Sequence, residues 1–309
     1  MGSENVAIRV FVGSSPRHLV PERVLVRSVL SRSSRPVEIN VIDPISDEIR
    51  RRDPDGRAQS LPLPAAWKGR MFVGGTGFHY CRFAPPELCQ YEGRAIYLEA
   101  DQLVLGDIAE LWEFPLDGAC CAAVPADRIR GTIHDLQTGG YASSVVLYDC
   151  SRSTGLDALK ICEESEVPGQ DKAEFSMADN FLQRTRLTVT ALPEQWNDHE
   201  RRFSDTKLLH FTYQATWPVD TPLHPESPVW IDEYLAAVED GLLDKHILDR
   251  ALEISAISQR VRFLAELPRW SVPAVDLIWQ HGEYSYARAR KALRSLVNIA
   301  GRLRAPKHH

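Results

Sequence analysis

The sequence predicts an α/β fold in which helices flank a central, mostly parallel sheet. Short apolar runs rich in β-branched residues alternate with segments whose apolar residues recur at helical spacing, as in 6–13, 21–30 and 37–43. A further strand, 94–98, ends at a pair of carboxylates, and ligands of open α/β sheets bind beyond the carboxyl ends of strands. The same observations therefore predict both the fold class and the position of a site.

The composition is that of an ordinary globular protein. The 309 residues are 44% hydrophobic and 25% charged, and no apolar run approaches the roughly 20 residues that cross a membrane. The six cysteines show no repeated C-x-x-C spacing, so we expect reduced thiols, no zinc site and a cytoplasmic protein. We expect neither a secretory signal nor a nucleic-acid partner.

The first elements form a right-handed βαβ unit, with strands at 6–13 and 37–43 joined by a helix at 21–30. The polar, proline-containing stretch 47–68 is expected to be a surface excursion. The glycine-rich segment 69–80 is either a mobile loop over a cleft or a simple turn, and the sequence does not choose between them.

Later segments repeat these patterns. We expect strands at 120–124, 138–149, 187–191 and 207–212, and a helix at 151–166. From Val229 onward the apolar spacing is helical, with one helix over 247–264 and a last one over 286–303.

The strand at 94–98 leads into Glu99 and Asp101, and residues two apart in an extended chain point to the same side. Two such carboxylates repel each other unless they share a cation or a proton, and a hard divalent cation is their natural partner. Taken alone, such a pair is more often two ordinary loop carboxylates. A glycoside hydrolase also needs two carboxylates, but these must flank the glycosidic bond about 5–9 Å apart, which one strand face does not allow.

Residues 97–112 read Tyr-Leu-Glu-Ala-Asp-Gln-Leu-Val-Leu-Gly-Asp-Ile-Ala-Glu-Leu-Trp and resemble the signature of the family 8 glycosyltransferases, the glycogenin and galactosyltransferase-like group. The family pattern is close to YLDADxLVxGDLxELW, so Glu99 stands where its first Asp is usual. This departure keeps the charge but lengthens the side chain by one methylene. The resemblance extends over 8–218 and implies a GT-A type nucleotide-sugar-binding fold with a C-terminal helical extension.

The resemblance also implies which residues hold the donor. In the family the end of the first strand cradles the nucleotide, an arginine lies near the acidic motif, and small polar residues at a later strand start contact the donor sugar. The matching donor-binding residues are Phe11, Val12, Gly13, Ser14, Arg82, Glu99, Ala100, Ser143 and Ser144. Because 142–144 reads Ala-Ser-Ser where the family has Asn-Ser-Gly, sugar recognition is expected to differ in detail. Arg82 is expected to pair with Asp101 or with the donor diphosphate.

The implied metal ligands are Glu99, Asp101 and His210. Residues 207–212 resemble the family segment whose His is the third protein ligand, and this mixture of oxygen and nitrogen ligands suits Mn²⁺ or Mg²⁺. A lone His after two leucines is otherwise more often a satisfied core residue. The family lysine that would contact the diphosphate is missing here, and the candidates to replace it are Arg201, Arg202 and Lys207.

Residues 175–182 resemble the family segment in which an Asp binds sugar hydroxyls and a Gln lies beneath the anomeric carbon. Asp179 matches the Asp, and Asn180, one methylene shorter, stands where the Gln is usual. With Asp101 these are the expected catalytic residues. The alternative is that 178–180 merely caps a helix.

The resemblance implies a retaining, metal-dependent hexosyltransferase that uses a nucleotide sugar, most commonly UDP-glucose or UDP-galactose, and a glycan or lipid-linked acceptor. The cation would neutralise the departing nucleoside diphosphate. Because several family positions differ here, a non-catalytic nucleotide-sugar-binding or scaffold protein of the same fold stays open.

The C-terminal part differs in charge from the rest. Residues 1–220 are expected to form the catalytic domain and 221–309 a helical region on the acceptor side or at a membrane. From His281 onward there are seven Lys/Arg against Glu283 alone, whereas the whole chain carries −6. A basic amphipathic helix over 286–303 can lie peripherally on the inner face of an anionic membrane, or pack on its own domain with a solvated basic face.

Overall fold

A computed structural model describes residues 6–70, 77–131, 139–165, 177–213 and 217–280 of the chain. The chain divides into two compact units, 1–213 and 214–309. Of the predicted features, residues 71–76 of the glycine-rich segment 69–80 and the whole basic helix at 286–303 lie outside the described residues.

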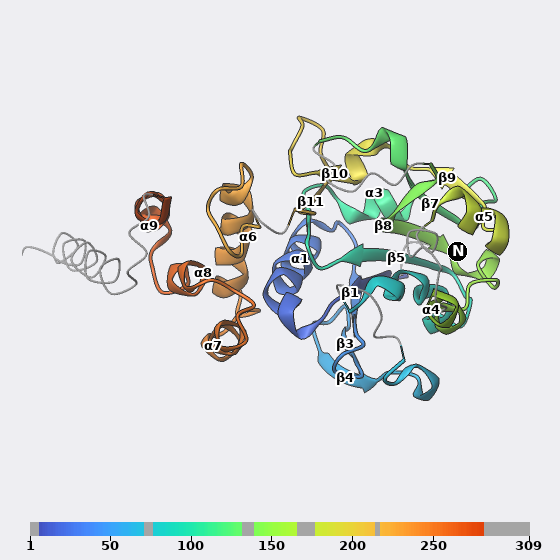
Figure 1. Ribbon diagram of the computed structural model, residues 1–309, viewed down its shortest axis with the longest axis horizontal. Helices are drawn as coiled ribbons and strands as arrows, with labels where there is room; N and C mark the ends of the chain where they lie inside the picture. The colour runs from blue at the N-terminus through green and yellow to red at the C-terminus, as the bar shows by residue number, and fades with distance from the viewer. Residues whose placement is uncertain (1–5, 71–76, 132–138, 166–176, 214–216, 281–309) are drawn as a thin grey trace, which may run out of the picture. The chain divides into compact units, whose positions relative to one another are not determined.

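The first unit is built on an eight-stranded sheet with the strand order β4-β3-β2-β1-β5-β8-β7-β9 (Figure 1). The strands are β1 (Ile8–Gly13), β2 (Val37–Asp43), β3 (Glu48–Arg52), β4 (Ala58–Pro62), β5 (Arg94–Glu99), β7 (Cys121–Pro125), β8 (Tyr141–Asp149) and β9 (Val189–Ala191). β1 runs parallel to both β2 and β5, whereas β8 runs antiparallel to β5 and β7. The α/β prediction is confirmed, but the sheet is mixed and not mostly parallel, because the β2–β3–β4 meander and β8 pair antiparallel.

The stretch 47–68 is wrongly predicted as a surface excursion. Strands β3 and β4 form a hairpin that continues the sheet beyond β2, with Ile49 opposite Ile42 in the pairing. Ile49 is buried in the core, whereas the three arginines that follow it are only partly covered. Strand β3 is second from the edge of the sheet, and its run of charged side chains obscures the alternation by which a strand is identified.

Alternate residues of the central strands supply two apolar clusters, one on each face of the sheet. On β5, for example, Ile96 and Leu98 belong to one cluster and Ala95 and Tyr97 to the other. A strand buried on both faces reads as a continuous apolar run, which is why 94–98 could be recognised from the sequence.

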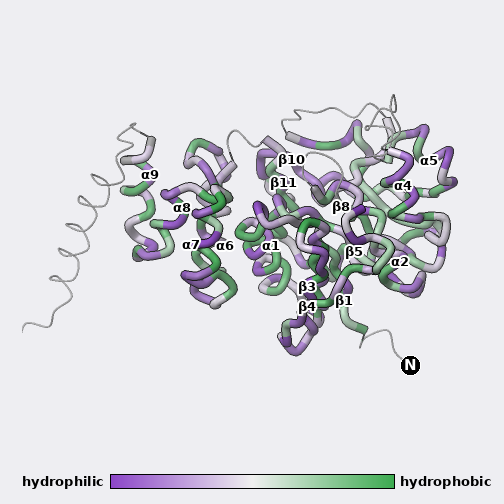
Figure 2. The backbone as a smooth tube through the Cα atoms, turned by 60° about the horizontal axis from the view of Figure 1, so that its bottom comes forward, coloured by the Kyte–Doolittle hydropathy of each residue, from purple (hydrophilic) through white to green (hydrophobic). Residues whose placement is uncertain are grey.

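Helices cover both faces of this sheet. They are α1 (Leu19–Arg32), α2 (Pro85–Leu88), α3 (Ile108–Trp112), α4 (Ala158–Ser165) and α5 (Asp179–Thr185). Helices α1 and α3 supply residues to one apolar cluster, and α4 and α5 to the other. Along α1, hydrophobic and hydrophilic residues alternate (Figure 2), as expected of a helix with one buried side. The backbone amide of Ala109 donates to the side chain of Asp107, which caps the N-terminus of α3.

Short 3-10 turns connect several of these elements. They cover Pro16–His18, Ala65–Trp67, His79–Phe83, Ala126–Arg128, Cys150–Arg152, Glu194–Trp196 and, in the second unit, Arg269–Ser271. The residues before the acidic strand form the 3-10 turn at His79–Phe83 followed by α2. The prolines at 85 and 86 begin the new helix, because proline lacks the amide that would continue the preceding one.

A second, three-stranded sheet contains the last two strands of the first unit. Its strands are β6 (Gln102–Val104), β10 (Asp198–His199) and β11 (Leu208–His210), in the order β10-β11-β6. β10 and β11 run parallel, and β11 pairs antiparallel with β6. Since β6 follows β5 after a two-residue turn, this sheet brings residues near 200 and 210 to the end of β5.

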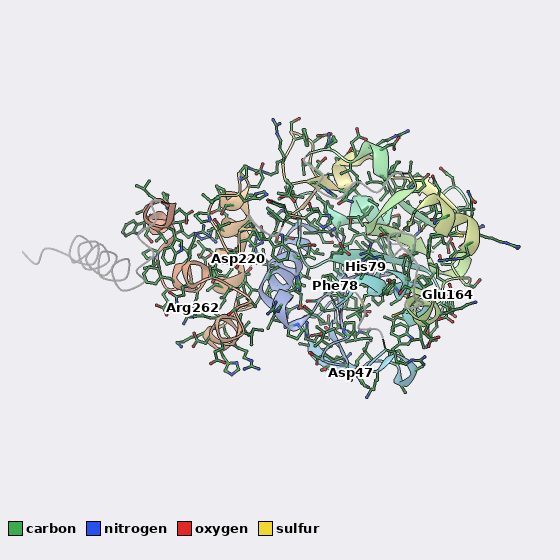
Figure 3. The ribbon with its side chains drawn as sticks, in the orientation of Figure 1. Asp47, Phe78, His79, Glu164, Asp220 and Arg262 are labelled. Atoms are coloured by element: carbon green, nitrogen blue, oxygen red, sulfur yellow. The ribbon has the colours of Figure 1, made fainter. Side chains whose placement is uncertain are left out.

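The second unit is helical, with α6 (Ser227–Glu239), α7 (Lys245–Glu253), α8 (Gln259–Leu264) and α9 (Val272–Gln280). The single helix expected over 247–264 is two helices. Ser258 caps the second of them, because its side chain accepts a hydrogen bond from the amide of Val261. Arg262, labelled in Figure 3, joins α8 to α7 through Asp249 at 2.6 Å. In the described part of the chain no helix is both long and apolar enough to span a membrane.

Candidate active site

Three predicted metal ligands meet at the end of β5. Glu99 is the last residue of β5, Asp101 lies in the turn that follows, and His210 is the last residue of β11. The Nε2 atom of His210 is 3.2 Å from Asp101 Oδ1 and 3.7 Å from Glu99 Oε2. Each side chain offers one ligand atom, and these three atoms all lie within 4.8 Å of one another.

The turn after β5 and the pairing of β6 with β11 produce this convergence. Because His210 is paired with Gln102 across the two strands, the end of β11 lies beside the turn that contains Asp101. The amide of Phe211 donates to the Asp101 carbonyl at 3.0 Å, which holds the two segments together. The carboxylates were expected to share one face of a single strand, but Asp101 has left the strand and reaches the same place through the turn.

Burial opposes the charged form of all three side chains, but their mutual attraction competes with it. Burial raises the pKa of Glu99, with Arg82 acting in the opposite direction. At Asp101 burial acts to raise the pKa, but the attraction and hydrogen bond of His210, with the attraction of His18, together outweigh it, so the pKa of this carboxyl is lowered. At His210 burial acts to lower the pKa, but the combined attraction of Asp101, Glu99 and Glu200 outweighs it, so the pKa of the imidazole is raised. A positive charge between the carboxylates is therefore stabilised here, whether it is a proton or a metal ion.

Arg82 neutralises the outer side of Glu99. Its Nη2 atom lies 2.7 Å from Glu99 Oε1, its Nη1 donates to the hydroxyl of Ser143, and its Nε donates to the carbonyl of His79 at 2.6 Å. His79 is labelled in Figure 3, in the 3-10 turn before α2. Of the two partners predicted for Arg82, Asp101 is not the one found: the guanidinium binds the other carboxylate and leaves Glu99 Oε2 facing His210.

A chain of amide and hydroxyl groups fixes the orientation of His210. Its Nδ1 atom lies 3.2 Å from Asn197 Oδ1, and Asn197 Nδ2 donates to the hydroxyl of Ser144 at 3.0 Å. Since the Asn197 amide nitrogen is already used, its oxygen accepts from Nδ1–H, and Nε2 is the ring nitrogen directed at the carboxylates. Gln102 supports the same region by donating to the Ser144 carbonyl at 3.0 Å.

The predicted donor-binding residues at the end of β1 use their side chains mainly within the protein. Phe11 and Val12 are buried, one in each apolar cluster. A Cβ atom on Gly13 would lie 2.3 Å from the hydroxyl oxygen of Tyr97, so only glycine fits there. The Ser14 hydroxyl donates to Glu22 at 2.7 Å. The connection to the acidic motif is through the backbone, where the amide of buried Ala100 donates to the Gly13 carbonyl at 3.3 Å.

Asp179 and Asn180 begin α5 and are both exposed. Asp179 lies against the turn before β8, where a Cβ atom on Gly139 would be 2.5 Å from its Oδ2. Neither residue forms a hydrogen bond or ion pair with Glu99, Asp101 or His210 among the described residues. The structure thus joins the predicted metal ligands to one another, but not to the other two predicted catalytic residues.

Two buried histidines near the acidic motif were not predicted. His18 lies edge-on against Phe78, with Ser15 Oγ 2.7 Å from its Nδ1. His199 lies edge-on against His210, with their ring centres 4.8 Å apart, and burial followed by the charge of His210 lowers its pKa to about 3. The strand that carries His199 has two residues, too few for any periodicity to reveal it.

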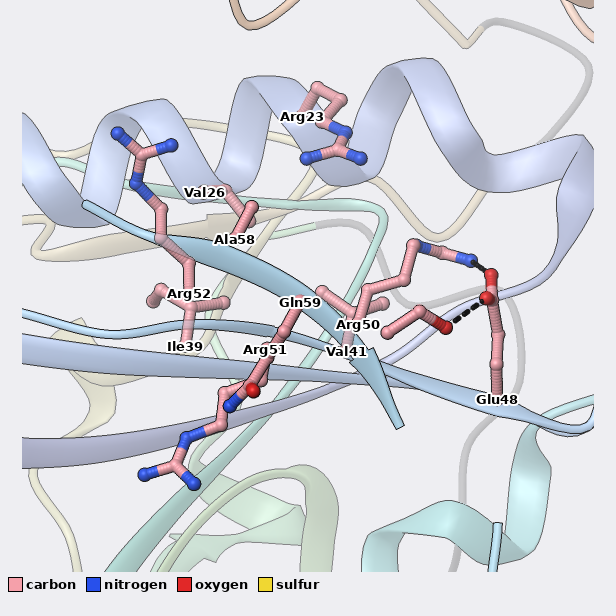
Figure 4. A pocket seen from close by; sticks show the side chains of 11 residues that line it. Arg23, Val26, Ile39, Val41, Glu48, Arg50, Arg51, Arg52, Ala58 and Gln59 are labelled. Carbon is pink, nitrogen blue, oxygen red and sulfur yellow. Dashed lines mark hydrogen bonds and ion pairs between the residues drawn. The ribbon is translucent and has the colours of Figure 1, made fainter. Parts of the chain in front are cut away.

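A pocket of about 260 Å³ lies elsewhere in the first unit, beside α1 and the β3–β4 hairpin (Figure 4). Four arginines line it together with apolar side chains, and one of them, Arg50, binds Glu48 at 2.7 Å. No residue predicted for the donor or the cation belongs to its lining. We therefore place the candidate active site at the end of β5 and not in this pocket.

Two comparisons of the sequence with known proteins found matches. The model of the family "Glycosyl transferase family 8" matches residues 75–198. The protein CDI of Arabidopsis thaliana is 31% identical over 230 residues, which cover 70% of this chain and 81% of CDI.

Two solved structures resemble the chain in fold. The bifunctional glycosyltransferase WbbM matches with a TM-score of 0.52 at 12% identity, over 76% of this chain and 50% of WbbM. The glycosyltransferase GlyE of Streptococcus pneumoniae TIGR4 matches with a TM-score of 0.51 at 16% identity, over 82% of this chain and 65% of GlyE. The chain thus spans half of WbbM and less than two thirds of GlyE, and the predicted glycosyltransferase fold is confirmed.

Proposed function

The chain belongs to glycosyl transferase family 8, and we propose that it transfers a hexose from UDP-glucose or UDP-galactose to a glycan or lipid-linked acceptor, with retention of the anomeric configuration. The observation that supports this most is the meeting of Glu99, Asp101 and His210 at the carboxyl end of a central strand. Ligands of α/β sheets bind at this edge.

The residues present fit a divalent cation. Two carboxylate oxygens and one imidazole nitrogen make a mixed set suited to Mn²⁺ or Mg²⁺. Asp101 Oδ1 is buried and, among the described residues, has only the imidazole of His210 beside it, at 3.2 Å, so a cation would supply the further partner that this oxygen can accept. A bound cation would act as a Lewis acid that neutralises charge on the departing nucleoside diphosphate.

The surrounding side chains would prepare this set. Arg82 occupies Glu99 Oε1, so that Oε2 is the oxygen directed to the cation. Asn197 accepts from His210 Nδ1 and thereby keeps Nε2 free as a ligand. Arg82 donates to the hydroxyl of buried Ser143, and Asn197 donates to the hydroxyl of buried Ser144, so both serines belong to the same hydrogen-bond network.

The roles of the other predicted residues are part of the proposal. We assign the donor nucleotide to the end of β1 and the donor sugar to Asp179, Asn180 and the start of β8, on the family pattern. A cytoplasmic location, and contact of the second unit with the acceptor or with a membrane surface, remain predictions from the sequence.

A donor-hydrolysis screen tests the proposal. UDP- and GDP-sugars are incubated with the protein and Mn²⁺, with and without EDTA, beside Asp101→Asn, which removes the charge and keeps the shape. A matched control is Asp55→Asn, because the Asp55 side chain is 70% exposed in the β3–β4 turn. We expect one donor to release nucleoside diphosphate, and only EDTA and Asp101→Asn to abolish the release. Absence of release, with no donor-induced rise in melting temperature, would instead favour the non-catalytic scaffold.

A further inference from the structure

His199 stands out among the buried polar side chains near the acidic motif. It is 8% exposed, and among the described residues neither of its ring nitrogens has a hydrogen-bond partner. One nitrogen of an imidazole always carries a proton, and leaving a buried donor unpaired has a free-energy cost. A side chain with this cost needs a partner from outside the described residues, and a bound ligand is one.

The backbone of His199 is firmly held, so its direction is defined. Its amide donates to the Arg130 carbonyl at 2.8 Å, and its neighbour Asp198 is clamped by Arg130 at 2.6 Å and by Thr206 at 2.6 Å. Since successive residues of a strand point to opposite sides, the clamp on Asp198 turns His199 the other way.

That other side is the side of the metal ligands. His199 is paired with His210 across the parallel strands β10 and β11, and His210 with Gln102 across β11 and β6 (Figure 1 labels β10 and β11). Cross-strand neighbours share a face of the sheet, which agrees with the contact between the two imidazole rings. The ring of His199 therefore lies immediately beside the cluster of Glu99, Asp101 and His210.

His199 is not itself a member of that cluster. The group of ligand atoms that lie within 4.8 Å of one another contains Glu99, Asp101 and His210 only, among the described residues. Because its ring centre is 4.8 Å from that of the ligand His210, His199 borders the cation site closely enough to meet one of the groups that the cation would bind. In the proposed reaction these are the oxygens of a nucleoside diphosphate, which are strong acceptors for a buried N–H.

We propose that His199 binds the diphosphate of the nucleotide-sugar donor, by donating a ring N–H to a phosphate oxygen beside the cation. The inference rests on the proposed function, because it needs a nucleoside diphosphate at this cluster. It assigns His199 to binding the departing group and not to holding the cation.

Two substitutions separate this role from a structural one. His199→Phe keeps an aromatic ring against His210 but has no N–H, whereas His199→Gln restores an amide N–H at a similar reach. His224→Phe is the matched control, because His224 is also buried but lies in the second unit. Affinities for Mn²⁺ alone and for inorganic pyrophosphate with Mn²⁺ are measured by titration calorimetry, beside melting temperatures. KM and kcat are measured for the donor that the hydrolysis screen identifies.

We expect His199→Phe to bind pyrophosphate about 10- to 100-fold more weakly, because it loses a hydrogen bond to a charged group. Its Mn²⁺ affinity should stay within about twofold of the wild type. His199→Gln should recover part of the loss, and KM for the donor should rise with it. The control should match the wild type in both affinities.

Other results overturn the assignment. Equal pyrophosphate affinity in wild type and His199→Phe would exclude a contact with the diphosphate. A rise in KM for the donor would then reflect a contact with its sugar. A parallel loss of Mn²⁺ affinity would make His199 a support for His210. If the wild type binds no pyrophosphate with Mn²⁺ and releases no nucleoside diphosphate, the proposed function fails together with this inference. If the wild type does both, the proposed function stands and the His199 variants test the inference alone.

Discussion

Replacing Arg82 by methionine should destabilise the first unit strongly, because it leaves Glu99 as a buried carboxylate without its partner. Both side chains are about nine-tenths buried, and their closest N–O distance is 2.7 Å. Breaking such a pair from one side costs about 3–5 kcal/mol, whereas removing both charges together is often nearly neutral. We therefore expect Arg82→Met to cost about 3–5 kcal/mol and the double variant Arg82→Met/Glu99→Gln to cost clearly less than the sum of the two single variants.

The cost should depend on pH. Burial already raises the pKa of Glu99 above that of an exposed carboxyl, and loss of Arg82 should raise it further. An acid whose pKa is higher in the folded than in the unfolded state loses stability as the pH rises above the unfolded value, because the unfolded state then releases its proton first. Arg82→Met should thus be less destabilised at pH 5 than at pH 8.

Urea unfolding in EDTA, with the four members of the cycle at both pH values, measures these quantities. Arg57→Met is the control, because the Arg57 side chain is 77% exposed and its ion pair with Asp55 should contribute less than about 1 kcal/mol. A cost below about 1 kcal/mol for Arg82→Met, or additivity of the two single variants, would refute the argument that Glu99 is buried as a charge.

Three further predictions concern the same site. Mn²⁺ affinity should rise as the pH passes through and above the usual pKa range of histidine, because Asp101 raises the pKa of His210 and only the neutral imidazole binds metal. Calorimetric titration between pH 6 and 8.5 measures this dependence, and an affinity that does not change with pH would contradict it. Asn197→Leu should weaken Mn²⁺ binding about 10- to 100-fold by releasing His210 Nδ1, and an unchanged affinity in the same titration would show that Asn197 does not orient the ligand. Gly13→Ala should cost about 1–3 kcal/mol through its contact with the Tyr97 hydroxyl, and Tyr97→Phe should restore part of the loss in urea unfolding; no restoration would place the strain elsewhere.

Local patterns identified a large part of this molecule. The first βαβ unit and the strand before the acidic motif could be predicted because buried strands and amphipathic helices have their own periodicities in the sequence. The edge hairpin β3–β4 could not, since neither the arginine-rich β3 nor the mostly exposed β4 shows the alternation of a buried face. The family resemblance supplied the fold and the three candidate metal ligands, because motif residues keep their spacing within each segment.

The sequence by itself thus determined the elements and named Glu99, Asp101 and His210, while the tertiary structure decided how they meet. The antiparallel pairing of β6 with β11 joins segments that are far apart in the chain, and no local periodicity encodes such a pairing. The parallel pairing of β10 with β11 sets His199 beside His210, and the packing of the 3-10 turn before α2 gives Arg82 to Glu99 and not to Asp101. Contacts of this kind depend on how whole elements pack against one another, so they appear only once the chain has folded.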